Sequence, residues 1–369
     1  MKNTSRRQFL KAAGLSAGAL ALSTTPLAQL QSSPLQADKK LGIALVGLGG
    51  YSSYKLAPAF KETEHCYLAG IVTGTPSKAE KWMKEHNIPK TNVYNYQNFD
   101  RIKDNPAIDI IYVVLPNGMH AEYTIRAAEA GKHVICEKPM AISVAEGEAM
   151  VAACKKAGVL LQIGYRVHYD PYTQELKRVG QNRVLGQIKT IQTGNAFYAS
   201  GFSNWRYNDK ALSGGGALMD MGVYCVQGCR YTTGEEPVAV MAQAFNTRPD
   251  GIIDVEETML WHMEFPSGAV ASCMTGYGAR SDFIKVSAVD GNFGLEPGYG
   301  YGLPQGHVKG AAMDYPHINQ QAAQMDAFAK NIMEGTPVIA SGEMGVLDMK
   351  VIEAIYKSAK NGRRVKVGA

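Results

Sequence analysis

Apolar and polar positions in the first half of the chain follow a repeating order that predicts a parallel sheet. Short runs of consecutive apolar residues are typical of strands buried on both faces. Amphipathic segments of helical length separate these runs, and this alternation predicts an α/β domain with a doubly wound sheet. The expected strands are 41–46, 67–72, 109–115, 133–136 and 159–164, and the expected helices are 54–60, 76–86, 121–130 and 144–157.

The pattern changes after Tyr165, where strands follow one another with few helices between them. One clear helix, 215–231, interrupts the strands, and helices return at 319–333 and 345–359. This order predicts an α+β domain with a large, mostly antiparallel sheet. The glycine-rich residues 294–310 are expected to form a loop over the site. The expected strands are 187–197, 238–245, 258–265, 269–275 and 283–289.

The N-terminal residues have the pattern of an export signal. Arg6 and Arg7 precede a weakly apolar run over 12–22, which is too short to span a bilayer comfortably. We expect export of the folded protein to the periplasm by the twin-arginine route, and a basic amphipathic helix is the alternative. The expected organisation is a signal peptide and linker over 1–37, a nucleotide-binding domain over 38–164 and a substrate and oligomerisation domain over 165–369.

Composition limits the kinds of partner that the chain can have. The 369 residues are 46% hydrophobic and 19% charged, as in globular proteins, and the net charge is +5. The first 37 residues hold four of these charges and no acid, so the rest of the chain is close to neutral. A near-neutral body gives no basis for binding nucleic acid or, in the mature form, a membrane. The six cysteines include no CxxC pair, so we expect buried free thiols and no metal site.

A glycine-rich turn, Gly47-Leu48-Gly49-Gly50-Tyr51-Ser52, directly follows the first predicted strand. In a Rossmann domain the first glycine permits the tight turn, and the second lets the backbone approach a pyrophosphate at a helix N-terminus. Ser52 stands where a third glycine is usual, and it is small enough for the helix to pack closely. Because a predicted strand precedes the turn and a helix follows it, we expect a dinucleotide site rather than an ordinary glycine turn.

The end of the second predicted strand favours NADP over NAD. An NAD site normally places Asp or Glu here to accept hydrogen bonds from the ribose, but no carboxylate occurs between Val72 and Ala79. Thr73, the open backbone of Gly74 and Lys78 can instead hold a 2′-phosphate. The alternative is a solvated loop in which Lys78 faces water.

Polar residues follow the other predicted strand ends, which line the ligand crevice in open α/β sheets. Asn117 and His120 follow one strand, Glu137 and Lys138 the next, and the cluster 165–171 a third. We expect this lysine to meet the substrate near the nicotinamide. A helix cap at the asparagine, a solvated lysine and surface ion pairs in the cluster are the alternatives.

Asp220 and Tyr224 are four residues apart, so on a helix they share one face. Their apolar neighbours indicate that this face is buried or lies in a cleft. A tyrosine near a lysine can act as acid or base, because the ammonium group favours the phenolate while burial opposes both charges. An aspartate cap and a core tyrosine are the alternative.

Four motifs carry a family resemblance: the glycine turn, Leu115-Pro116-Asn117, Gly131-Lys132-His133-Val134 and Glu137-Lys138-Pro139. With these motifs the chain resembles the Gfo/Idh/MocA oxidoreductases over about residues 40–366. The periplasmic glucose–fructose oxidoreductase branch is the most similar, since most other members have histidine where this chain has Tyr224. Residues 94–100, 165–171, 205–206, 214–224 and 234–237 also match that branch.

The resemblance implies hydride transfer between two sugars with NADP as the cofactor and with Lys138, Asp220 and Tyr224 as the catalytic set. It also implies a homodimer or homotetramer formed through the open sheet. The arm before Leu41 is short, so permanent retention of the cofactor is not implied. An aldose dehydrogenase with exchangeable NADP, an NAD-dependent redox glycosidase and a sugar sensor remain open. The residues implied to contact the cofactor are Gly47, Leu48, Gly49, Tyr51, Thr73, Lys78, Tyr96, Leu115, Asn117, His120, Glu137, Lys138, Arg166, Trp205, Arg206 and Tyr301, with Tyr299 as the alternative to the last.

Overall fold

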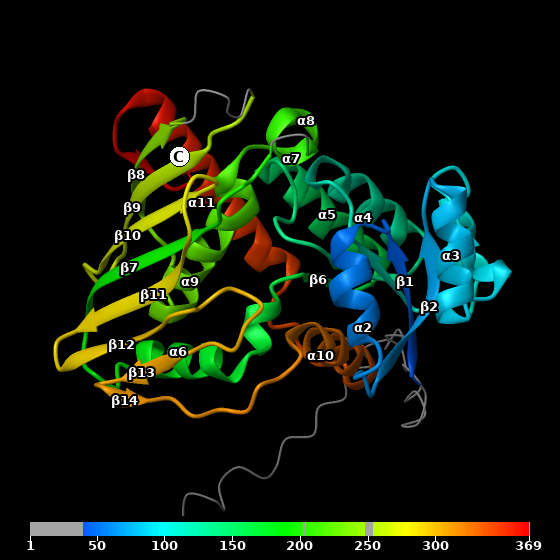
Figure 1. The fold of residues 1–369 in the computed structure, drawn as a ribbon, viewed down its shortest axis with the longest axis horizontal. Helices are drawn as coiled ribbons and strands as arrows, with labels where there is room; N and C mark the ends of the chain where they lie inside the picture. Colours follow the sequence, from blue (N-terminus) through cyan, green and yellow to red (C-terminus); the bar gives the residue numbers. More distant parts are fainter. Residues whose placement is uncertain (1–39, 202–203, 248–253, 369) are drawn as a thin grey trace, which may run out of the picture. The chain divides into compact units, whose positions relative to one another are not determined.

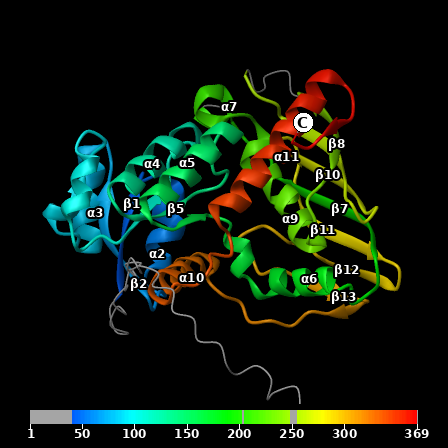
Figure 2. The same cartoon turned by 180° about the vertical axis from the view of Figure 1, so that it is seen from behind.

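Two sheets, one of six strands and one of nine, organise the chain (Figures 1 and 2). The computed structural model describes residues 40–201, 204–247 and 254–368. The export signal predicted over 1–37 lies outside the described residues, so it stays a prediction.

The first sheet is parallel throughout, with the strand order β3-β2-β1-β4-β5-β6. The order reverses between β1 and β4, and in such sheets a ligand binds at the carboxyl ends of the strands beside this reversal. This sheet confirms the predicted Rossmann domain. Its strands are β1 (Leu41–Val46), β2 (Cys66–Val72), β3 (Val93–Tyr94), β4 (Ile110–Val113), β5 (His133–Cys136) and β6 (Leu161–Ile163).

Helices cover both faces of this sheet, because successive side chains of a strand point to opposite faces. Ala44 and Val46 of β1 pack in one core with α4 and α5, whereas Ile43 and Leu45 pack in another with α3 and α10. Helix α10 follows eight of the nine strands of the other sheet in sequence, yet it packs on the first sheet (Figure 2). These helices are α3 (Pro76–His86), α4 (His120–Glu129), α5 (Val144–Ala157) and α10 (Gln320–Glu334).

The helix predicted over 54–60 is replaced by a π-helical turn, Ser52–Leu56, followed by the short α2, Ala57–Ala59. Pro58 has no backbone N–H, so it cannot donate the hydrogen bond that an α-helix would direct to residue 54. Short 3-10 turns join other elements of this half at Lys90–Asn92, Phe99–Asp104 and Asn117–Met119.

The second sheet has the order β14-β13-β12-β11-β7-β10-β9-β8-β15, and only the β7–β10 pair among these is parallel. Helices α6, α9 and α11 pack against it, which confirms the predicted α+β arrangement (Figure 1). The strands are β7 (Ile188–Ala196), β8 (Ala239–Phe245), β9 (Thr258–Glu264), β10 (Val270–Gly276), β11 (Ser281–Ala288), β12 (Gly291–Leu295), β13 (Gly306–Val308), β14 (Ala311–Ala312) and β15 (Val365–Lys366).

Helix α6, Pro171–Gln181, was not predicted, although its start signals are present. Asp170 caps it by accepting the N–H of Tyr172, and a proline occupies its first position. The helix predicted over 215–231 is a π-helical turn, Leu218–Gly222, that continues into α9, Val223–Thr233. The other elements are the 3-10 turn Arg166–Tyr169, α7 (Trp205–Asn208), α8 (Lys210–Ser213) and α11 (Gly342–Asn361). Within the described ranges, no helix has the length and apolarity that crossing a bilayer requires.

Candidate functional site

A cavity of about 650 Å³ opens at the carboxyl ends of β1, β2, β4 and β5 and extends to the π-helical turn before α9. Its walls include every site residue predicted from the sequence except Arg166. The segment 294–310, predicted as a loop, contains parts of strands β12 and β13 near its two ends. Between these strands, Tyr301 lines the cavity, whereas Tyr299 is buried and does not line it.

The glycine turn has the geometry that a pyrophosphate requires. Gly47 has φ of +96°, and a Cβ there would lie 2.5 Å from the carbonyl oxygen of Val114. A Cβ at Gly49 would meet no atom within 4 Å, so the backbone borders open space at this point. The buried Ser52 hydroxyl donates to the carbonyl of Gly47 at 2.6 Å and fixes the turn against the following helical turn. These residues fit a dinucleotide.

The end of β2 presents hydroxyls and a cation to the same cavity. The buried Thr73 hydroxyl accepts the N–H of Thr75 at 3.2 Å. Lys78 donates from Nζ to the carbonyl of Leu48 at 3.3 Å, so its charge lies beside the glycine turn. The carboxylates in the cavity wall are Glu137 and Asp220, and neither belongs to this strand end.

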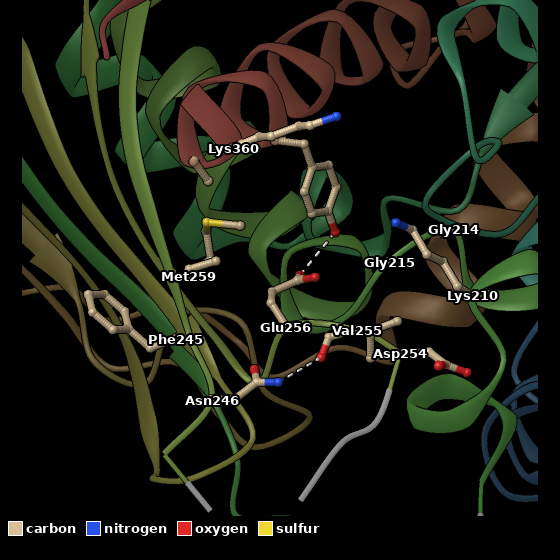
Figure 3. Close-up of a pocket in the computed structure, with 13 residues that line it drawn as sticks. Lys210, Gly214, Gly215, Phe245, Asn246, Asp254, Val255, Glu256, Met259 and Lys360 are labelled. Carbon is tan, nitrogen blue, oxygen red and sulfur yellow. Dashed lines mark hydrogen bonds between the residues drawn. The ribbon is translucent and has the colours of Figure 1, made fainter. Parts of the chain in front are cut away.

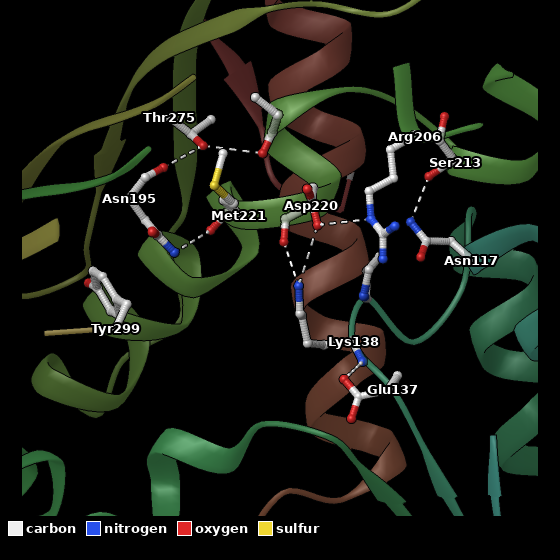
Figure 4. A network of polar contacts seen from close by, with 12 residues as sticks. Asn117, Glu137, Lys138, Asn195, Arg206, Ser213, Asp220, Met221, Thr275 and Tyr299 are labelled. Atoms are coloured by element: carbon white, nitrogen blue, oxygen red, sulfur yellow. Dashed lines mark hydrogen bonds and ion pairs between the residues drawn. The ribbon is translucent and has the colours of Figure 1, made fainter. Parts of the chain in front are cut away.

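His120 connects the ends of two neighbouring strands. Its ring nitrogens lie 2.8 Å from the carbonyl of Pro139 and 2.9 Å from that of Leu115. Burial lowers the pKa of this histidine to about 4. The neutral ring carries a single N–H, so it donates to one of these carbonyls and packs against the other. His120 thereby sets the spacing between the segment after β4 and the segment that carries Lys138. Asn117 connects the segment after β4 to a part of the chain that is distant in sequence: its amide donates to the carbonyl of Ser213 at 2.8 Å (Figure 4).

The three predicted catalytic residues all line the cavity, and Figure 4 shows two of them, Lys138 and Asp220, in contact. Lys138 Nζ donates to the backbone oxygen of Asp220 at 2.6 Å and lies 3.7 Å from its Oδ1. Arg206 Nε lies 3.7 Å from the same carboxylate oxygen. Lys138 Nζ also lies 5.0 Å from the centroid of the Tyr224 ring. Asp220 thus holds two cations, and one of them lies over the tyrosine.

Glu256, which sequence reasoning missed, holds the turn that leads to Asp220. Its carboxylate accepts the N–H groups of Gly216 and Leu218 at 2.9 and 3.0 Å, and the hydroxyl of Tyr356 at 3.0 Å. Glu256 is labelled in Figure 3. A Cβ at Gly216 would lie 2.0 Å from the Glu256 carbonyl, so this position requires glycine. The second cavity shown in Figure 3, also of about 650 Å³, contains no predicted site residue in its walls.

The environment of Tyr224 determines which of its protonation states is stable. Burial raises the pKa of this phenol above its ordinary value, the Arg166 guanidinium lowers it, and the carboxylates of Glu137 and Asp220 raise it. The Glu137 carboxylate accepts a hydrogen bond of 2.6 Å from the Tyr112 hydroxyl, which in turn accepts one from Gln324 on α10. Burial raises the pKa of Glu137 as well.

Arg166 is the predicted cofactor contact that does not line the cavity, so its contact with the cofactor stays a prediction. It is 2% exposed and donates to the carbonyls of Tyr299 and Gly300 and to the side-chain oxygen of Gln320. Its Cζ lies 4.2 Å from the centroid of the Tyr301 ring. The guanidinium therefore supports the loop that forms one wall of the cavity.

The six cysteines are free and buried, as expected. In the part of the chain that the structure describes, no group of three or more His, Cys, Asp or Glu side chains is placed to hold a metal ion.

Comparison with known proteins agrees with this geometry. Residues 41–165 match the GFO_IDH_MocA oxidoreductase family with an NAD-binding Rossmann fold, and residues 173–291 match the C-terminal domain of the same family. The crystal structure of aldose-aldose oxidoreductase from Caulobacter crescentus, complexed with glycerol, is 42% identical with a TM-score of 0.86, covering 89% of this chain and 100% of that one.

Two further relatives are more distant. The D-xylose 1-dehydrogenase [NADP(+)] of Haloarcula marismortui is 26% identical over 89% of this chain and 94% of its own length. Levoglucosan dehydrogenase, solved with NADH and levoglucosan, shares the fold with 23% identity and a TM-score of 0.78, over 90% of this chain and 100% of its own. Both halves of the chain match one family, and the residues predicted from its motifs converge on one cavity. The chain therefore belongs to the Gfo/Idh/MocA oxidoreductase family.

Proposed function

We propose that this protein is a sugar oxidoreductase that uses NADP. The observation that carries the proposal is the convergence of Lys138, Asp220 and Tyr224 in the wall of a cavity that the glycine turn also lines. The similarity to an aldose-aldose oxidoreductase over nearly the whole chain supports a sugar as the substrate.

Oxidation of a sugar carbinol removes a proton from the hydroxyl group and a hydride from its carbon. A bound nicotinamide dinucleotide would supply the carbon that accepts the hydride. Tyr224 accepts the hydroxyl proton as the O–H bond breaks. The Lys138 ammonium stabilises the negative charge that develops on the sugar oxygen. Asp220 keeps that ammonium in place, because it accepts through its backbone and lies at ion-pair distance through its side chain.

The preference for NADP rests on the end of β2. Thr73 and Lys78 offer a hydroxyl and a cation where an NAD site has a carboxylate. The NADP-dependent xylose dehydrogenase supports this choice. The levoglucosan dehydrogenase with NADH shares only the fold at 23% identity, so it carries less weight for the cofactor.

We further propose that a donor and an acceptor sugar react in turn on one protein molecule. The donor aldose becomes a lactone by losing a hydride and a proton, and the acceptor, a ketose or an aldose, gains both and becomes an alditol. Such a cycle suits an exported enzyme, for which no free NADP is expected outside the cytoplasm, and the paired arginines in the first residues support export.

Product analysis tests this function. The purified, dialysed protein is incubated with glucose and fructose without added cofactor, and Tyr224→Phe is the control. Gluconolactone and sorbitol in equal amounts are the expected result. If the parent needs added NADP, the protein is a dehydrogenase with exchangeable cofactor. If an aryl glucoside is cleaved instead, the protein is a redox glycosidase, and if no sugar reacts at all the oxidoreductase function is wrong.

The open face of the second sheet supports a homodimer or homotetramer. Met241, Leu260 and Val270 on three adjacent strands are each more than 40% exposed on the face opposite the helices. An apolar surface of this kind favours association. Sedimentation velocity at several concentrations checks it, and a monomer at all of them contradicts it.

A further inference from the structure

Arg166 is a buried cation that forms no salt bridge among the residues that the structure describes. Its side chain is 2% exposed, and its three hydrogen-bond acceptors are neutral: two backbone carbonyls and the amide oxygen of Gln320. Across residues 40–201, 204–247 and 254–368, no carboxylate lies within ion-pair distance of it. Its Nε is buried without a hydrogen-bond partner in this part of the chain. A buried charge normally has an anion beside it, so an unpaired guanidinium requires an explanation.

The other cations near the site show the contrast. Lys138 and Arg206 both lie 3.7 Å from Asp220 Oδ1, so that carboxylate balances part of their charge. Arg230, the other buried arginine beside this core, is paired with Asp348 and Glu236. Among these four cations, Arg166 is the one with no carboxylate at ion-pair distance. The Glu137 carboxylate attracts it from farther away and already accepts a hydrogen bond from Tyr112.

The group best placed to balance it is the phenol of Tyr224. The Arg166 Cζ lies 5.7 Å from the centroid of the Tyr224 ring, and the tyrosine lines the cavity whereas the arginine does not. The phenol can carry a negative charge only after it loses its proton. A guanidinium at this position therefore favours the state of the tyrosine that can accept a proton.

We propose that Arg166 is a positioning residue that stabilises the phenolate of Tyr224, a role that rests on the proposed function of Tyr224 as proton acceptor. Before the reaction the phenolate and the guanidinium balance each other. When the sugar O–H bond breaks, its proton forms the phenol O–H bond, and the electron pair left on the sugar oxygen forms the carbonyl as the hydride departs. Lys138 thus stabilises the negative charge on the sugar oxygen, whereas Arg166 stabilises the negative charge of the phenolate.

The other charged and titratable groups around Tyr224 oppose this state or are already paired. Burial raises its pKa most, and the two carboxylates raise it further. Without Arg166, Lys138 would be the remaining cation next to the ring among the described residues, and Asp220 already holds it. The groups facing Tyr224 are Glu137, Lys138, Asp220, Tyr51, Tyr165, Tyr299 and Tyr301.

A purely structural role is the competing explanation, because Arg166 also holds the loop that carries Tyr301. Asp282 on β11 holds the same loop independently: its carboxylate accepts the N–H groups of Gly298, Tyr299 and Gly300 at 2.9, 2.7 and 3.0 Å. The Asp282→Asn variant therefore loosens the loop while keeping the guanidinium, and it is the matched control.

The test measures the ionisation of residue 224 without relying on activity. 3,5-Difluorotyrosine, whose phenol is more acidic than that of tyrosine, is installed at position 224, and ¹⁹F NMR follows its titration. In Arg166→Gln, or in Arg166→Met if the first variant does not fold, the titration midpoint should rise by about one to three pH units. Arg166→Lys, which keeps the charge, and Asp282→Asn should titrate near the parent.

An unchanged midpoint in the neutral variants overturns the proposal, and so does an equal shift in Asp282→Asn. In parallel, the acid limb of kcat for sugar oxidation should move to higher pH in Arg166→Gln. If no sugar is oxidised by the parent, the proposed function fails, but the ¹⁹F titration still decides the role of Arg166. If sugars react and the midpoint does not move, only this inference fails.

Discussion

At the scale of single residues, the chemistry depends on which charges are paired. Asp220 holds Lys138 and Arg206, whereas Arg166 lies behind Tyr224 without a carboxylate. The motifs in the sequence were sufficient to select the first three of these residues. They could not place Arg166, because its exposure depends on the loop near residue 300, which is distant in the sequence. Glu256 was missed for the same reason: the segment that it holds, around Gly216, lies about forty residues earlier in the sequence.

Tyr224→Phe removes the proton acceptor and leaves the ring in place. We expect kcat to fall by about 10²–10⁴-fold, the range for loss of a general base, while binding of NADP remains close to that of the parent. Because the phenol must be deprotonated and burial raises its pKa, kcat of the parent should increase with pH until the phenol ionises. Steady-state kinetics over a pH series measure both effects, and a variant as active as the parent contradicts the assignment.

Lys78→Ala removes the cation at the end of β2. A hydrogen bond to a charged group contributes about 1.5–3 kcal/mol, so NADP should bind about ten- to a hundred-fold more weakly. Binding of NAD should change little, since it has no phosphate at that position. Isothermal titration of apoprotein with both cofactors measures the difference, and Lys81→Ala, one turn along the exposed side of α3, is the control. Equal losses of affinity for NAD and NADP would show that Lys78 does not bind the 2′-phosphate.

At the scale of elements, the site is built where strand ends are connected. His120 joins the segments after β4 and β5, and Glu256 joins the start of α9 to β9. The alternation of strands and helices in the first half was predictable, since it follows from short apolar runs and clear caps such as Ser143. The π-helical turns were not, because they depend on Pro58 in one case and on the hydrogen bonds of Glu256 in the other.

The His120 connection should make stability depend on pH. Its native pKa of about 4 lies below the ordinary value of about 6.5, so the native state disfavours the charged ring. The stabilisation is complete above pH 6.5 and is lost as the pH falls toward 4, by about 3 kcal/mol at most. The buried His168, with a pKa lowered to about 3, contributes in the same direction.

Urea unfolding between pH 7 and 4 measures this dependence. The free energy of unfolding should fall less steeply in His120→Gln than in the parent, and the exposed His317→Gln should behave as the parent. If the free energy of unfolding falls as steeply with pH in His120→Gln as in the parent, His120 is not the source of the pH dependence.

At the scale of the whole molecule, the fold brings residues more than 150 positions apart into one cavity. Helix α10, from the second half of the sequence, packs on the first sheet and supplies Gln324 to the Tyr112–Glu137 pair. Periodicity predicted both sheet types, but not this return, because an amphipathic helix does not specify which of two sheets it covers. The family motifs predicted the residues that line the cavity because these motifs lie at strand ends, and the carboxyl ends of parallel strands lie at the same edge of the sheet.

The measurement that tests the central claim most directly is the near-ultraviolet absorption of the purified, dialysed protein, recorded before and after glucose and then after a second sugar. The account predicts that glucose produces the band of reduced nicotinamide and that fructose or another acceptor removes it, with no cofactor added. In Tyr224→Phe the band should form far more slowly. A protein that carries the cofactor but shows no such change with any sugar would contradict hydride transfer at this site.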